Sequence, residues 1–191
     1  MDLRELLEEL EQLGEENDAA EKQREFKYLN ITRDTGEFLT MLIKASAARQ
    51  ILEVGTSNGY STLWLASALP EDGHVTTLEV SAYKIEHAVQ NFRRANLDHK
   101  ITVLQSDALD YLSQGNVQFD FIFLDANRSR YIEFASQVIA RLRPGGLLIC
   151  DNAISHASEM EEFIGFVKNT GEFSVVIVPI GKGEFVACKN R

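Results

Sequence analysis

An apolar run, a glycine-bearing turn and a second apolar segment follow one another between residues 51 and 69, and this succession constrains the fold most. The run Ile51–Val54 predicts a buried strand, Gly55 and Gly59 bracket a turn, and Thr62–Leu69 has helical spacing. An open α/β sheet presents a small ligand at such a turn, at the carboxyl end of its first strand. The sequence therefore predicts a ligand site at this turn.

The glycine spacing argues against a dinucleotide as that ligand. Nicotinamide and flavin sites use G-x-G-x-x-G, whereas this turn reads G-x-x-x-G, with Ser57 where the second glycine would stand. A carboxylate at Glu53 would repel a pyrophosphate, but it suits a ligand with an ammonium group, such as the methionine part of S-adenosylmethionine. A dehydrogenase is therefore a poor alternative.

Strand and helix patterns then alternate along the chain, which favours a doubly wound, mostly parallel α/β sheet with right-handed crossovers. Two further apolar runs, 175–178 and 184–187, are joined by a Gly-containing segment and predict a closing hairpin that adds one antiparallel strand. The other expected strands are 51–55, 75–80, 101–104, 119–125 and 146–150, and the expected helices are 60–69, 81–95, 107–113, 130–142 and 157–169.

Length and composition fit one globular domain, since the chain has 191 residues of which 45% are hydrophobic. We expect a helical extension over residues 1–30 and the ligand-binding domain over residues 31–191. In the extension, leucines at positions 3, 6, 7, 10 and 13 predict an amphipathic packing or dimer helix that Gly14 ends. Thr32 is the expected N-cap of the next helix.

Charge and cysteine content give weaker indications. The net charge of −10 is concentrated in residues 1–25, which hold ten acidic and three basic residues, so nucleic acid is disfavoured but a basic cleft stays possible. Cys150 and Cys188 lie in apolar runs and are expected to be buried thiols. No apolar run approaches the roughly 18 residues of a membrane span, and no signal peptide is apparent, so a cytoplasmic protein is expected.

Acidic residues at the ends of the second and third strands are typical of a nucleoside site. Glu79 is placed to accept hydrogen bonds from both ribose hydroxyls. Asp107 could meet an adenine amino group or could cap the following helix, and the two roles are compatible.

Two later strands end in oxygen-bearing side chains, Asp125 on one and Asp151 with Asn152 on the other. If the strands are neighbours, these side chains converge. Carboxylate and amide oxygens with room for water suit a hard divalent cation such as Mg²⁺. A single such strand end would be interpreted as a turn or cap, but two together favour a metal site.

The chain contains an ordered set of short motifs: Gly36-Glu37-Phe38-Leu39, Leu52-Glu53-Val54-Gly55 with Gly59-Tyr60-Ser61, Leu124-Asp125-Ala126, Pro144-Gly145-Gly146, Asp151-Asn152 and Pro179-Ile180-Gly181-x-Gly183. As a set, these motifs resemble the cation-dependent O-methyltransferases of the catechol and caffeoyl-coenzyme A type. The resemblance runs from about residue 30 to the carboxyl terminus. It implies a Rossmann-like domain of about seven strands that uses S-adenosylmethionine and Mg²⁺ or another divalent cation. The implied cofactor contacts are Ile31, Glu53, Gly55, Ser61, Glu79, Asp107 and Asp125, and the implied metal ligands are Asp125, Asp151 and Asn152.

The chain departs from this family pattern at the residue three positions after Asp125. The family usually has a lysine there, proposed as the general base, whereas this chain has Arg128, which proteins essentially never deprotonate. Arg128 could hold a phenolate or an anionic substrate group, or it could be a solvated side chain. His156 could serve as the base instead. The segment 153–161 is also shorter than the family loop that covers the acceptor.

Three functions remain as hypotheses. The first is an O-methyltransferase acting on a small catechol-like, vicinal-oxygen acceptor, with catalysis assigned to Asp125, Arg128 and His156. The second is a tRNA hydroxyuridine methyltransferase, with Arg33, Arg128 and Arg130 as a basic rim. The third is a family member that binds S-adenosylmethionine without turnover. By family analogy we expect a homodimer.

Overall fold

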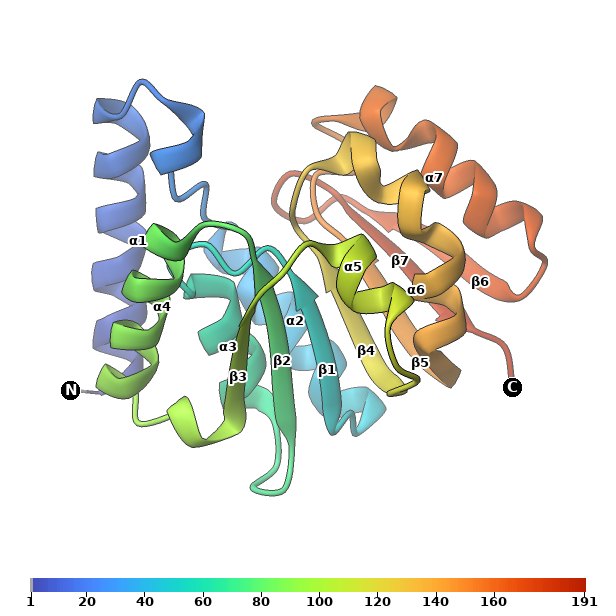
Figure 1. The fold of residues 1–191 in the computed structure, drawn as a ribbon, viewed down its shortest axis with the longest axis horizontal. Coiled ribbons are helices and arrows are strands. Elements are labelled where there is room, and N and C mark those ends of the chain that lie inside the picture. The colour runs from blue at the N-terminus through green and yellow to red at the C-terminus, as the bar shows by residue number, and fades with distance from the viewer. Residues whose placement is uncertain (1) are drawn as a thin grey trace.

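Residues 2–191, which the computed structural model describes, form a seven-stranded sheet in the order β3-β2-β1-β4-β5-β7-β6 (Figure 1). The strands from β3 to β5 pair in parallel, and β7 runs antiparallel to both of its neighbours. The predicted fold class and its closing hairpin are therefore confirmed. The strands are β1 (Gln50–Val54), β2 (His74–Glu79), β3 (Ile101–Gln105), β4 (Phe119–Leu124), β5 (Leu142–Cys150), β6 (Phe173–Val178) and β7 (Glu184–Lys189).

Helices cover both faces of this sheet and bury two separate apolar clusters. One face packs Ile51, Val75 and Phe121 against the helices at the amino-terminal end of the chain, and the other packs Leu52 and Ile122 against the later helices. In chain order the helical elements are α1 (Leu3–Ala20), η1 (Arg24–Phe26), α2 (Arg33–Ser46), α3 (Tyr60–Ala68), α4 (Ala82–Arg94), η2 (Asp98–Lys100), α5 (Ala108–Ser113), η3 (Arg128–Phe134), α6 (Ala135–Arg141) and α7 (Ala157–Asn169). No helix among residues 2–191 is long and apolar enough to cross a membrane.

The first helix differs from its prediction, because α1 continues past Gly14 to Ala20. Gly14 is buried, and a Cβ atom there would lie 2.4 Å from the Asn30 side chain. Asn30 in turn donates a hydrogen bond to the Leu10 carbonyl, at 3.0 Å. Glycine is therefore needed at position 14 for close packing and does not end the helix.

The buried leucines of α1 pack against other helices of the same chain. Leu6 and Leu10 are fully buried in the same cluster as Leu63 of α3, whereas Leu13 is exposed. The packing alternative is therefore confirmed, and these buried leucines are not available as a dimer contact. Thr32 does precede α2, but its hydroxyl contacts Asp34 and Thr35 and caps no backbone N–H group.

The fifth strand begins earlier than predicted, at Leu142 in place of residue 146. The helix expected over residues 130–142 is divided into η3 and α6 and ends at Arg141. The buried Arg141 guanidinium donates to the carbonyl groups of Leu112, Gln114 and Val117, which ties the end of α6 to the loop before β4. Leu142 then pairs with Phe119, and a register shift follows. Tertiary contacts therefore decide this boundary.

Candidate cofactor and acceptor site

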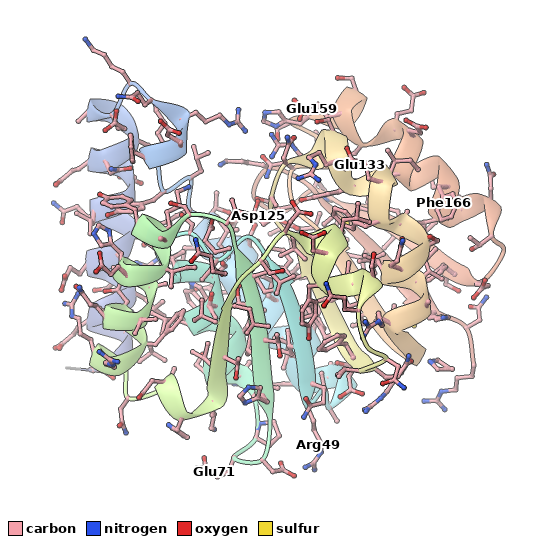
Figure 2. All side chains as sticks on the ribbon, in the orientation of Figure 1. Arg49, Glu71, Asp125, Glu133, Glu159 and Phe166 are labelled. Atoms are coloured by element: carbon pink, nitrogen blue, oxygen red, sulfur yellow. The ribbon has the colours of Figure 1, made fainter. Side chains whose placement is uncertain are left out.

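A cavity of about 1110 Å³ opens at the carboxyl ends of the central strands. Figure 2 shows Asp125 at this end of the sheet, opposite Arg49 and Glu71. The size is sufficient for a nucleoside ligand together with a small second molecule. The predicted site residues that line it are Ile31, Gly55, Ser61, Glu79, Asp107, Asp125, Arg128, Asn152 and His156.

The glycine turn after β1 is shaped by two close approaches. Gly55 has φ +107°, and a Cβ atom there would lie 2.1 Å from the carbonyl oxygen of Asp125. Gly59 has φ +88°, and a Cβ atom there would lie 2.5 Å from the Phe92 ring. Both positions combine a left-handed backbone with contact against a neighbour, so only glycine fits without displacement. The turn therefore brings the ends of β1 and β4 together.

Glu53 lies in the protein core beneath the cavity, and it is fully buried. Its carboxylate accepts hydrogen bonds from Ser61 at 2.6 Å, Thr62 at 2.5 Å and Thr77 at 2.6 Å. Burial raises the pKa of Glu53 to about 7, although the three hydroxyl donors oppose the shift. Ser61 does line the cavity, so an effect of Glu53 on a ligand would pass through that hydroxyl.

Glu79 and Asp107 are held in place by backbone groups. Glu79 accepts from the N–H groups of Ser57, Val80 and Ser81 at 2.9 to 3.0 Å. Asp107 accepts from the Leu109 N–H at 2.9 Å, which confirms its role as a helix cap. Both side chains also line the cavity, so each is oriented before a ligand binds.

Asp125, Asp151 and Asn152 are brought together because β4 and β5 are neighbours. Asp151 is buried, and its carboxylate accepts from the backbone N–H and the side-chain amide of Asn152, each at 2.6 Å. Burial, and then the charge of Asp151, raises the pKa of Asp125 well above its usual range. Burial also raises the pKa of Asp151. The predicted convergence is therefore present.

A third carboxyl group, Glu184, joins this cluster and was missed by the sequence analysis. It is fully buried at the start of β7, where Thr35 donates to it at 2.9 Å. Burial, and then the charge of Asp151, raises the pKa of Glu184 to about 10. The available signal was an acidic residue in the otherwise apolar run that follows Gly183.

Arg128 is neither solvated nor free. Its side chain is 7% exposed, and its Nε donates to Glu159 of α7 at 3.1 Å. The interpretation of Arg128 as a solvated arginine is therefore wrong. His156 lies on the cavity wall directly before α7, with its Nδ1 2.9 Å from the Ser155 hydroxyl.

Comparison with known proteins identifies the family. The family described as O-methyltransferase matches residues 2–181. This chain belongs to that O-methyltransferase family. It is 36% identical, over 70% of its length, to a catechol O-methyltransferase of Niastella koreensis. It is 35% identical, over 76% of its length, to a caffeoyl-CoA O-methyltransferase of Populus kitakamiensis. The chain spans 62% and 65% of the lengths of these two relatives.

The fold of this O-methyltransferase matches solved structures of the family. The crystal structure of an O-methyltransferase from Bacillus cereus in complex with SAH superimposes with a TM-score of 0.85. The two sequences are 28% identical, and the match covers 97% of this chain and 91% of the other. The predicted family and enzyme class are therefore confirmed.

Each of the three arginines expected to form a basic rim for tRNA binding is paired with carboxylates. Arg33 makes salt bridges with Glu8 and Glu11, at 3.5 and 2.5 Å. Arg130 makes salt bridges with Asp107 and Glu133, at 2.7 and 3.0 Å. Since Arg128 is paired with Glu159 as well, phosphate binding by these three arginines would require them to exchange their carboxylate partners.

Proposed function

We propose that this O-methyltransferase transfers the methyl group of S-adenosylmethionine to an oxygen of a small acceptor with vicinal oxygens, and that a divalent cation assists. The position of Asp125 carries the proposal. Asp125 lines the cofactor cavity beside the glycine turn, and it also belongs to the acidic cluster with Asp151. A methyl donor and an acceptor oxygen would therefore meet beside one side chain.

The cofactor contacts follow from the cavity wall. Glu79, fixed by three backbone N–H groups, is our candidate for the ribose hydroxyls, and Asp107 is our candidate for the adenine amino group. The methionine part would lie near Gly55 and Ser61. The SAH complex of the Bacillus cereus relative supports this class of ligand.

The donor atoms beside Asp125 fit a divalent cation. Two buried or half-buried carboxyl groups lie together, and within residues 2–191 neither forms a salt bridge with a lysine, arginine or histidine. Within residues 2–191, no three His, Cys, Asp or Glu side chains are arranged to hold a metal on their own. Our assignment therefore combines two carboxyl groups with one amide oxygen, and the proposed protein ligands are Asp125, Asp151 and Asn152. A bound divalent cation would supply Lewis acidity, which lowers the pKa of an acceptor hydroxyl.

The remaining chemistry falls to side chains of the cavity wall. Arg128 does not serve as a base, because a guanidinium stays protonated, and Glu159 holds it against α7. His156 is our candidate for taking the acceptor proton. The wall orients the acceptor oxygen toward the methyl group, and such orientation can contribute on the order of 7–11 kcal/mol in favourable cases.

The test is transfer of labelled methyl from S-adenosylmethionine to a panel of catechols, with Mg²⁺ and again after addition of EDTA. We expect transfer that EDTA abolishes and that Asp151→Ala reduces at least about a hundredfold. Asp98→Ala, at an exposed position outside the cavity, is the matched control and should retain activity. Full activity of Asp151→Ala would contradict the metal assignment. Cofactor binding without transfer to any acceptor would instead indicate a binder without turnover.

A further inference from the structure

One of the cationic residues in the cavity wall lies far from Arg128 in the sequence. Lys182 belongs to the turn between β6 and β7, and it lines the same cavity as Asp125 and Asn152. Its side chain is exposed, and no side chain among residues 2–191 forms a hydrogen bond or salt bridge with its ammonium group. Arg128, by contrast, is buried and paired with Glu159. Lys182 therefore has an ammonium group free to bind a ligand.

The backbone of Lys182 is fixed to the segment that follows Asn152. The carbonyl oxygen of Lys182 accepts from the N–H groups of Ile154 and Ser155, at 3.3 and 3.0 Å. Gly183 has φ +95°, and a Cβ atom there would lie 2.4 Å from Ile154. On the other side of the turn, the Gly181 N–H donates to Asp34 of α2 at 3.1 Å. Hydrogen bonds on both sides therefore hold the turn that carries Lys182.

We propose that Lys182 is a catalytic residue that binds the acceptor oxygen as it ionises and holds it for attack on the methyl group. This inference rests on the proposed function. The acceptor O–H bond breaks, and its proton leaves to His156 or to water. The new O–CH₃ bond forms as the S–CH₃ bond of the sulfonium breaks, and sulfur keeps the electron pair. The product ether is neutral, so the attraction to Lys182 ends with the reaction.

The test uses 4-nitrocatechol as a chromophoric probe, because its ionised form absorbs at longer wavelength. It is titrated with pH in the presence of the protein, SAH and Mg²⁺, so that no turnover is required. Binding to the unmodified protein should lower the apparent pKa of the probe. Lys182→Met keeps the length of the stem but removes the charge, and it should weaken binding of the ionised probe about tenfold to a hundredfold. Lys182→Arg should restore most of this binding.

Lys168→Met is the matched control, since Lys168 is an exposed lysine of α7 outside this cavity, and it should leave probe binding unchanged. If the unmodified protein binds the probe and Lys182→Met binds it equally well, the role of Lys182 is wrong while the proposed function stands. If the unmodified protein neither binds nor methylates any catechol, both are wrong. If Lys182→Arg fails like Lys182→Met although both variants melt cooperatively, the lysine acts through the shape of its turn, and the charge role is overturned.

Discussion

Glu53 is a carboxyl group that the protein keeps in its core, and its surroundings make the stability of the protein depend on pH. The carboxyl pKa is about 7 in the folded protein and 4.5 as the reference value for an exposed group. The folded state therefore holds the proton more tightly than the unfolded chain does. The contribution of Glu53 to the free energy of unfolding is therefore largest below pH 4.5, and it is lost as the pH rises through about 7.

We expect Glu53→Gln to remove this pH dependence. At pH 5 the variant should be less stable than the unmodified protein, because its amide nitrogen faces the hydroxyl donors of Ser61, Thr62 and Thr77. The difference should narrow by up to roughly 3 kcal/mol as the pH rises to 8. Urea denaturation of both proteins at several pH values measures this difference in the free energy of unfolding. A constant difference over this range would show that Glu53 does not titrate there.

Gly55 supports a second prediction for a single residue. Because Gly55 has no Cβ atom, the turn after β1 can lie against the carbonyl group of Asp125. Gly55→Ala should displace Asp125 and weaken SAH binding by at least about tenfold, and calorimetric titration with SAH measures this loss. Gly165→Ala is the matched control, because no atom lies within 4 Å of a Cβ at that helical position. Unchanged SAH affinity in Gly55→Ala would contradict the role of this close approach.

Among the elements, α1 contributes to the same apolar cluster as the central sheet. Leu10 is fully buried there, whereas Leu13 is 42% exposed. Leu10→Ala should lower the free energy of unfolding by about 2–5 kcal/mol, and Leu13→Ala should lower it far less. Urea denaturation followed by circular dichroism measures both. If the two substitutions have equal effects, α1 is not packed as the structure shows.

The C-terminal hairpin contributes two residues to the site. Its turn carries Lys182, which lines the cavity, and its strand β7 begins with Glu184, which lies beside Asp151. The strand pattern of 175–178 and 184–187 indicated a hairpin, but the pattern does not specify its partner. The antiparallel pairing of β7 with β5 places Phe185 opposite Cys150, the residue before Asp151.

In the whole molecule, the cavity joins segments from both ends of the chain. Most residues of the segment 24–31 line it, together with the turn after β1, the ends of β4 and β5, and the turn of the C-terminal hairpin. The Tyr28 carbonyl accepts from the Ser57 hydroxyl at 2.6 Å, so the amino-terminal segment is tied to the glycine turn. A ligand in the cavity should therefore stabilise distant parts of the sequence together.

We expect SAH to slow hydrogen exchange in residues 24–31 and 55–61, and to raise the unfolding temperature by an amount that grows with the logarithm of its concentration over its Kd. Mass spectrometry of the exchanged protein, with and without SAH, measures the first effect. Strand β6 lines no part of this cavity, so its local exchange is the internal control. Protection confined to residues 55–61 would show that the amino-terminal segment does not cover the ligand.

Local sequence was sufficient to predict the alternation of strands and helices, the glycine turn, and the positions of Asp125, Asp151 and Asn152 at strand ends. These features are local, because periodicity, turn chemistry and side-chain type are expressed within short segments. The family resemblance added the expected ligands, and membership of that family is confirmed.

Tertiary structure alone decided which of these groups face the cavity. Glu53 and Ser61 are eight residues apart, yet the carboxyl lies in the core and the hydroxyl on the cavity wall. Three contacts of the site join elements that are distant in the chain. Glu184 is buried beside Asp151, Arg128 is paired with Glu159, and Lys182 lines the same cavity as Asp125. Local sequence does not specify such contacts, since strand order and packing set the distances, the burial and hence the charge of each group.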